Sequence, residues 1–287
     1  MPRWAVAALH EDETLRGNQM SKDRADCAHV QRALLVVAHP GHELRLFGWM
    51  CEARPELVVL TDGSGSIGQP RVDSSHRVLE AAGAVETGLF GLHSDQDYYT
   101  ALLNGDHAFF LRMETALMKV LRAGAYAVVV ADPLEGYNPT HDLCRIIVNV
   151  ALERLHRERA PVPLNFDYAL TSPLPPPAVG ERGGRHPIQL SEAALAAKIQ
   201  AARGYPELAW EIDQALAREG AQAFAREELR AVTGDRLALR PPTVPPQYET
   251  YGEERRDAGI YRDVIRYEQH VLPVVNALVA SLPVAAR

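Results

Sequence analysis

The sequence predicts an α/β fold in which helices cover both faces of a mostly parallel, Rossmann-like sheet. Two observations support this class. Between residues 33 and 170, short apolar runs of strand length alternate with segments of helix length, the pattern that produces parallel strands joined by right-handed crossovers. The runs are also apolar at nearly every position, as expected of strands that are buried on both faces.

The elements follow in order. Strands are expected at residues 33–38, 57–61, 88–92, 126–131 and 166–170. Helices are expected between them at 44–53, 72–82, 107–123 and 142–157, the last capped by Asp142. Residues 173–187, rich in proline and glycine, interrupt regular structure. Further helices are expected at 191–204, 206–218, 221–231 and 252–282, with a second proline-rich break at 241–246.

This order divides the chain of 287 residues into three parts. Residues 1–30 are expected to be a poorly ordered extension. They are not expected to be a secretory signal, because acidic residues directly follow the apolar start. Residues 31–190 form the predicted α/β domain, which holds the metal-binding and catalytic candidates described below. Residues 191–287 are predicted to be a helical region packed on the same domain. Its surface leaves room for a homo-oligomer, a question that the sequence leaves open.

Composition excludes several classes of function. The formal net charge of -7 argues against a nucleic-acid-binding protein, which needs a basic face. No apolar run approaches the roughly 18 to 20 residues of a membrane span. The three cysteines are widely spaced and form no CxxC pair, which favours reduced thiols and a cytoplasmic location over a disulfide framework.

Three histidines follow the ends of predicted strands. The segment AHPGHE places His39 and His42 after the first strand, and the segment EGYNPTHD places His141 after the fourth. Open α/β sheets bind ligands at the carboxyl ends of their strands, and three imidazoles meeting there can hold zinc with one position open. The sequence therefore predicts a metal site of His39, His42 and His141, with zinc favoured and another divalent metal such as Fe²⁺ left open.

The two segments resemble the signatures of the PIG-L/LmbE-like zinc-dependent N-deacetylases, which usually read AHPDDE and HPDH. The resemblance covers about residues 32–175 and extends weakly to Lys198 and Tyr205. It implies a zinc-dependent hydrolase that removes an acyl group from an N-acylated amino sugar or a related glycosylated metabolite, so the expected partner is a small sugar-containing molecule. It gives His39 and His141 the role of zinc ligands. His42 stands where the family has an aspartate ligand, and imidazole also suits zinc.

Three positions depart from the family pattern. Gly41 replaces the aspartate that acts as the general base, and Thr140 replaces an aspartate of the second signature. Asn138 replaces a histidine that stabilises the intermediate; it can donate a hydrogen bond to an oxyanion but cannot act as an acid. Because general acid-base help is worth about 100- to 10,000-fold, two outcomes stay open. The chain is either a deacetylase with altered proton transfer or a metal-binding relative whose reaction has been lost or changed.

Other polar residues are candidates for the remaining roles. Asp62 and Asp132 each follow a predicted strand and are possible substitutes for the base, although aspartates are also common in turns and caps. With Asn138 they make up the catalytic candidates. Asp95, which matches a sugar-binding aspartate of the family, is expected to bind substrate together with Arg77 and Tyr137; the alternatives are a turn and a surface salt bridge.

The stretch Gly63 to Gly68 spells GxGxxG after a strand, the pattern of a dinucleotide site. Such a site needs a helix that begins within the glycines, whereas Gln69 and Pro70 follow here. We expect a loop at the rim of the metal pocket. A nucleotide-dependent enzyme stays as the alternative.

Overall fold

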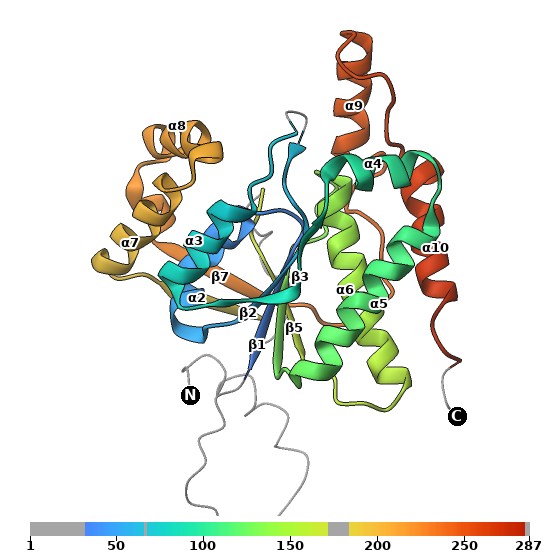
Figure 1. The fold of residues 1–287 in the computed structure, drawn as a ribbon, viewed down its shortest axis with the longest axis horizontal. Coiled ribbons are helices and arrows are strands. Elements are labelled where there is room, and N and C mark those ends of the chain that lie inside the picture. The colour runs from blue at the N-terminus through green and yellow to red at the C-terminus, as the bar shows by residue number, and fades with distance from the viewer. Residues whose placement is uncertain (1–31, 66–67, 172–183, 285–287) are drawn as a thin grey trace, which may run out of the picture.

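The computed structural model describes residues 32–65, 68–171 and 184–284, so the extension expected at residues 1–30 lies outside the described part. One seven-stranded sheet in the order β3-β2-β1-β4-β5-β7-β6 forms its centre (Figure 1). The parallel strands are β1 (Ala33–Val37), β2 (Glu56–Thr61), β3 (Val85–His93), β4 (Val128–Ala131) and β5 (Leu164–Tyr168). The predicted α/β class with a mostly parallel sheet is confirmed.

Two antiparallel strands, β6 (Arg185–Gln189) and β7 (Arg226–Ala231), extend the sheet beyond β5. The helix predicted at 221–231 is therefore wrong: a 3-10 turn, η5 (Ala221–Phe224), leads into β7. The charged composition of β7 suggested a helix, but Glu227 and Leu229 are buried between less buried neighbours, which is the period of a strand. The C-terminal region is thus not wholly helical, and the domain division stays a prediction.

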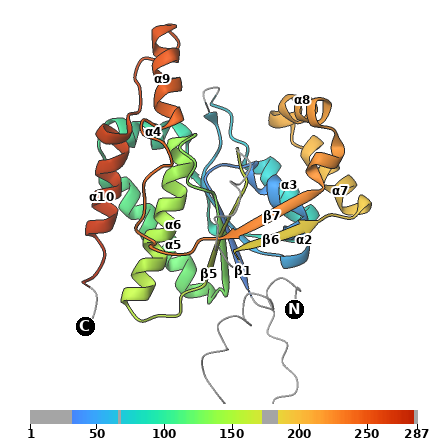
Figure 2. The same cartoon turned by 180° about the vertical axis from the view of Figure 1, so that it is seen from behind.

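Helices cover both faces of the sheet, as Figures 1 and 2 show. On one side lie α2 (Phe47–Ala53), α3 (Val72–Ala82) and α7 (Glu192–Arg203); on the other lie α5 (His107–Gly124), α6 (Pro139–Arg157) and α10 (Leu272–Ala280). Leu34 and Val36 pack into the core on the α5 and α6 side, whereas Leu35 and Val37 pack on the α2 and α3 side. Because both faces are covered, β1 is apolar throughout.

Several helix boundaries differ from the expected ones. The segment expected at 44–53 begins as a 3-10 turn, η2 (His42–Leu46), before α2. An unexpected helix, α4 (Asp95–Leu103), follows β3 with Ser94 as its cap. A short turn, η4 (Pro206–Leu208), precedes α8 (Ala209–Glu219). The single helix expected at 252–282 is divided into α9 (Gln247–Asp257), a π turn (Tyr267–Val271) and α10.

The strand order reverses between β1 and β4. From β1 the chain moves outward to β2 and β3, and it then returns to place β4 on the other side of β1. Ligand sites of open α/β sheets lie at this switch point, outside the carboxyl ends of the strands. The segment after β1 holds His39 and His42, and the segment after β4 leads to His141. The topology therefore brings both motifs to one edge of the sheet.

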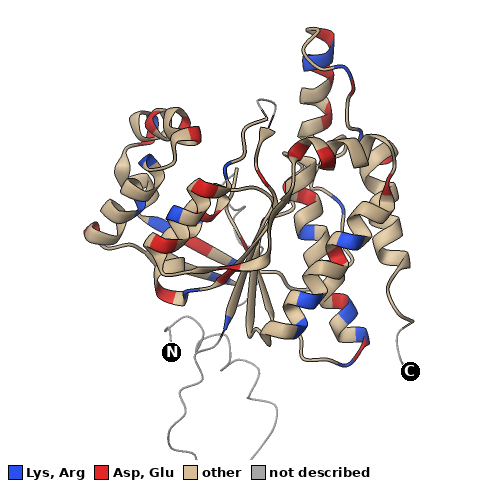
Figure 3. Ribbon diagram, in the orientation of Figure 1, with Lys and Arg blue, Asp and Glu red and all other residues tan. Residues whose placement is uncertain are grey.

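The outer surface carries mixed charge. Figure 3 shows Lys and Arg interspersed with Asp and Glu along the same helices. Among the described helices, none combines the length and the apolarity that crossing a membrane requires.

Candidate metal centre

The loop after β1 places two histidines one turn apart. Gly41 adopts φ 108° and ψ −24° at the start of η2, a backbone conformation that glycine accepts and other residues rarely adopt. Its amide donates to Glu43 Oε2 at 2.6 Å, and Ser75 Oγ donates to the other oxygen of that carboxyl. Burial raises the pKa of Glu43. Glu43 is fully buried and holds the loop from beneath, so it supports the site rather than facing it.

His39, His42 and His141 form a compact cluster. The ring centroids lie 5.4 Å apart for His39 and His42, 5.2 Å for His39 and His141, and 4.5 Å for His42 and His141. Three imidazoles bound to one zinc at about 2.1 Å in tetrahedral geometry would have centroids about 5 Å apart. The three rings are therefore as close together as the predicted metal site requires.

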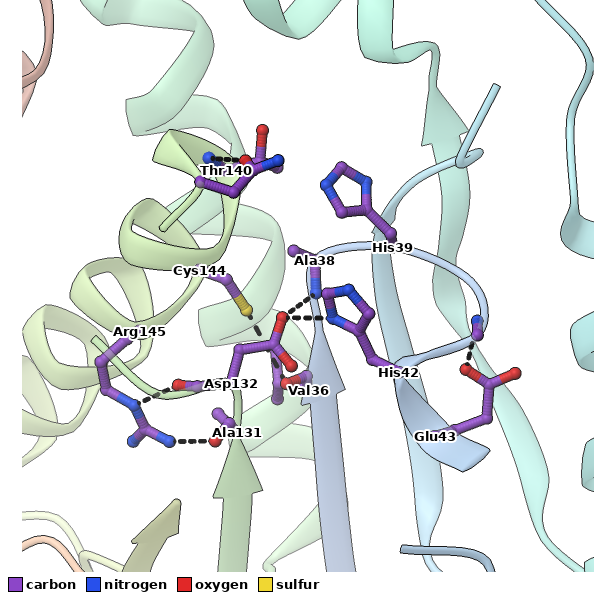
Figure 4. Close-up of polar contacts among 12 residues, drawn as sticks. Val36, Ala38, His39, His42, Glu43, Ala131, Asp132, Thr140, Cys144 and Arg145 are labelled. Carbon is purple, nitrogen blue, oxygen red and sulfur yellow. Dashed lines mark hydrogen bonds and ion pairs between the residues drawn. The ribbon is translucent and has the colours of Figure 1, made fainter. Parts of the chain in front are cut away.

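Hydrogen bonds fix the proton on two of the rings. His39 Nδ1 lies 2.8 Å from Thr61 Oγ1, which itself donates to the carbonyl of Ala38, and 3.1 Å from Asp95 Oδ1. Since a hydroxyl has one proton to donate, His39 Nδ1 is the donor in the first contact. His42 Nδ1 lies 2.8 Å from Asp132 Oδ2 (Figure 4). Both rings then keep the lone pair on Nε2, the atom left for a ligand.

His141 is held differently. It lies in the first turn of α6 and is almost fully buried, and its Nδ1 is buried without a hydrogen-bond partner. Leaving such an atom unsatisfied costs about 1–3 kcal/mol, so an additional ligand would stabilise it. Burial and the neighbouring His42 and His39 lower the pKa of His141 well below its ordinary value, which favours the neutral form that binds metals.

The three histidine rings are not oriented so that they complete a coordination shell. As placed, no group of three or more His, Cys, Asp or Glu side chains in the described residues is positioned to hold a metal ion. The donor chemistry, the ring separations and the orphaned nitrogen of His141 fit a metal. Its binding would require the rings to turn, so the ligand set stays a prediction.

Asp132 is not positioned as the general base that the sequence suggested. Its side chain is fully buried. Oδ2 accepts from the amide of Ala38 at 2.8 Å as well as from His42, and Oδ1 accepts from the Tyr168 hydroxyl at 2.6 Å. Burial would raise the pKa of this carboxyl, but His42 and the Tyr168 hydrogen bond outweigh it and lower the pKa to about 2. Asp132 therefore supports His42 and does not face the cleft.

Two further candidates lie away from the cleft. Asp62 accepts a hydrogen bond from the amide of Ser64 at 2.9 Å and so closes a turn. Arg77 is exposed on α3 and donates to Ser74 Oγ at 2.8 Å. Neither residue lines the cleft beside the histidines. The structure therefore does not bring either side chain to the histidines, and the base at Asp62 and the substrate contact at Arg77 stay predictions.

Asn138 lies beside the cluster and caps α6. Its Oδ1 accepts from the amide of Thr140 at 2.8 Å, a contact that directs the amide nitrogen Nδ2 elsewhere. Asn138 lines the cleft, so this nitrogen can donate to a bound molecule. The cap expected at Asp142 is wrong, because that carboxylate instead accepts from the amides of Glu135 and Gly136 in the preceding loop.

The two remaining substrate candidates both line the cleft. Tyr137 is 47% exposed and stacks on His141 with centroids 6.2 Å apart, so its ring is free to meet a ligand. Asp95 is buried, and its Oδ2 accepts from the amide of Gly65 at 2.7 Å while Oδ1 faces His39. Burial opposes ionisation, but contact with His39 outweighs it and lowers the pKa of Asp95. In this arrangement Asp95 orients His39 rather than a sugar.

The sequence interpretation missed residues that act through others. Arg145 is fully buried and donates to the carbonyls of Asp132, Ala131 and Phe166, which ties the ends of β4 and β5 together. Tyr168 lies at the end of β5, and the strand-end rule that found the histidines could also have found it. Nothing in the local pattern of α6 signals Arg145, because its acceptors are backbone atoms distant in sequence.

The cluster opens into a cleft of about 1670 Å³. This volume exceeds the roughly 300–1,000 Å³ of common small-molecule pockets. One wall includes Leu208, Ile212 and Leu216 from η4 and α8. The other includes Tyr251 and Tyr261, both of which are partly exposed.

The glycine-rich stretch does not form a dinucleotide site in the described residues. Helix α3 begins at Val72, beyond Gln69 and Pro70, so its N-terminus is not built from the glycines. Gly63 and Gly65 line the cleft, as expected of a rim loop, whereas residues 66 and 67 lie outside the described part.

Comparisons with known proteins add structural likeness only. No protein-family model and no curated protein matches the sequence. Among solved structures, the chain is similar to a deacetylase in the biosynthesis pathway of teicoplanin, with 12% identity over 71% of this chain and 99% of that chain (TM-score 0.48). A zinc-inhibited form of a teicoplanin deacetylase matches with 11% identity, 71% and 99% coverage and a TM-score of 0.47. A conserved protein from Thermus thermophilus matches with 19% identity, 71% and 95% coverage and a TM-score of 0.49.

Proposed function

We propose that this protein is a metal-dependent hydrolase, with zinc as the favoured metal, that removes the acyl group from an N-acylated amino sugar or a related glycosylated metabolite. The observation that carries the proposal is the clustering of His39, His42 and His141 at the switch point of the sheet. His39 and His42 keep Nε2 as their acceptor atom, and His141 has an orphaned nitrogen. The resemblance of both motifs to deacetylase signatures supplies the substrate class.

Each residue near the cluster has a role in this proposal. His39, His42 and His141 would hold the metal, which when bound polarises the amide carbonyl and makes water more acidic. Asn138 Nδ2 donates a hydrogen bond to the carbonyl oxygen as negative charge develops on it. Tyr137 offers an exposed aromatic face to the rest of the substrate, of the kind that often lines ligand pockets.

The missing carboxylate at position 41 supports a second candidate function. Neither Asp62 nor Asp132 lines the cleft, and Gly41 carries no side chain to accept a proton. A protein that binds a metal and a glycosylated ligand without cleaving its amide would have the same cluster. This alternative predicts binding without turnover.

A hydrolysis assay distinguishes the two functions. Protein stripped of metal with a chelator and reloaded with Zn²⁺ or Fe²⁺ is incubated with N-acetylglucosamine and with longer N-acyl glucosaminides, and the released amine is measured. The hydrolase predicts release that depends on metal and is lost in His141→Ala. Binding of these glycosides without release of amine would favour the alternative. Amine release that persists with no metal would contradict both.

A further inference from the structure

The carboxylate of Asp132 is surrounded by donors. The amide of Ala38 and the hydroxyl of Tyr168 each donate to it, and His42 Nδ1 is its third neighbour at 2.8 Å. Its main-chain carbonyl accepts from Arg145 Nε at 2.7 Å. A buried carboxylate with this set of contacts can only accept from His42, so it specifies which nitrogen of that ring carries the proton.

We infer that Asp132 is a positioning residue that holds His42 with Nδ1 protonated and Nε2 directed into the histidine cluster. The inference rests on the proposed metal site and assigns a role to a residue outside the cleft. Metal-binding histidines commonly donate their second nitrogen to a carboxylate, which fixes both the tautomer and the ring plane. In Figure 4 one oxygen of the Asp132 carboxylate faces both Ala38 and His42, with both contacts marked.

Because of this contact, replacing either His42 or Asp132 alone should weaken metal binding. A carboxylate at position 42 would face the Asp132 carboxylate with no proton between them, and like charges in a buried site repel strongly. An amide at position 132 is also a poor replacement. The carboxylate offers two oxygens to its three donors, whereas an amide offers one, so its NH₂ group would face the Tyr168 hydroxyl, which would then have to accept instead of donate. Replacing both residues together, with a carboxylate at 42 and an amide at 132, removes the repulsion.

The tautomer of His42 can be measured without metal. In metal-free wild-type protein, ¹⁵N NMR of the imidazole is expected to show a protonated Nδ1 and an unprotonated Nε2. In Asp132→Ala this preference should be lost. A wild-type ring protonated at Nε2 would overturn the inference, and this test does not depend on the folding of any variant.

Zinc affinity provides the second readout. Asp132→Asn and Asp132→Ala are expected to bind Zn²⁺ roughly 10- to 100-fold more weakly than wild type. The matched control is Asp62→Asn, which changes the same residue type directly after β2, on the other side of β1, and should leave the affinity unchanged. Asp132 variants that fold and bind zinc as tightly as wild type would overturn the inference.

The paired exchange is the most selective test. His42→Asp alone should bind Zn²⁺ more weakly than the double variant His42→Asp with Asp132→Asn, although each single change weakens binding. A double variant that binds Zn²⁺ no more tightly than His42→Asp would contradict this pairing of His42 with Asp132. If the wild-type protein binds no metal, the proposed function fails, whereas the NMR result still decides the role of Asp132.

Discussion

Leu208 occupies the space beside Gly41, the residue that precedes His42 in the first motif. A Cβ placed on Gly41 would lie 2.6 Å from Leu208 Cδ1 and 3.8 Å from the Tyr205 hydroxyl. An apolar side chain from the C-terminal region thus covers the point from which a carboxylate at position 41 would extend. Together with φ 108°, this contact explains why the loop is built around glycine.

Restoring a carboxylate at this position should therefore destabilise the protein. Gly41→Asp is expected to cost about 1–3 kcal/mol of unfolding free energy, because a side chain adopts this backbone conformation only with strain. Adding Leu208→Ala should relieve the contact with Leu208 but not the backbone strain. Urea unfolding of both variants checks this prediction, and Gly41→Ala combined with Leu208→Ala is the control for backbone strain without the contact. A Gly41→Asp variant as stable as wild type would contradict it.

The two functions of Asn138 can be separated by substitution. Asn138→Asp keeps the helix cap, since aspartate caps as well as asparagine, but it removes the Nδ2 donor. Stability should stay close to wild type while any deacylation rate falls about 100- to 1,000-fold. Asn138→Ala should lose the cap as well, at about 1 kcal/mol. Equal rates for Asn138→Asp and wild type would exclude the proposed role of the amide.

The buried pair of Lys198 and Glu227 should be essential for stability. Lys198 Nζ lies 2.8 Å from Glu227 Oε1, and Glu227 also accepts from the amides of Gly48 and Trp49 at the start of α2. Lys198→Met should cost about 3–5 kcal/mol, because it leaves a buried charge without its partner. The control is Arg203→Met on the same helix, whose exposed pair with Asp213 should contribute less than about 1 kcal/mol. Similar losses in the two variants, measured by chemical unfolding, would contradict the prediction.

The contacts of Glu56 at the amino-terminal ends of β1 and β2 should contribute stability that depends on pH. Glu56 accepts from the Tyr126 hydroxyl at 2.6 Å and from Arg32. Burial opposes ionisation, but these two hydrogen bonds lower the pKa of Glu56 below its ordinary value. A lowered carboxyl pKa stabilises the folded state above the unfolded pKa of about 4.3, and this contribution is lost as the pH falls. Glu56→Gln should thus be less stable than wild type at pH 7, and the difference should shrink as the pH falls through the folded pKa of Glu56, as urea unfolding at a series of pH values would show.

Much of the fold could be predicted because its strands are apolar on both faces. Continuous runs such as Ala33–Val37 have one plausible structure between helical segments. Strand β7 could not be predicted in this way, since its alternating burial arises only from pairing with β5 and β6. Helix α4 was missed because Asp95 and Asp97 suggest a turn, although Ser94 with Asp97 forms a capping box.

The candidate site could likewise be predicted only in part. The spacing of the motifs places His39, His42 and His141 at strand ends, and the topology then brings them together. The roles of Asp132 and Asp95 could not be predicted, because a position after a strand does not tell whether a carboxylate faces the cleft or a neighbouring ring. Those roles depend on side-chain partners that lie far away in sequence, such as Tyr168 and Gly65.

Metal content tests the central claim most directly. Protein stripped with a chelator, reloaded with Zn²⁺ and freed of excess metal should retain one zinc per chain, and His39→Ala, His42→Ala and His141→Ala should each lose it. His93→Ala is the matched control, because His93 ends β3 and packs against Phe109 outside the cluster; it should keep its zinc. A wild-type protein without bound zinc, or a His141→Ala variant that retains it fully, would contradict the account.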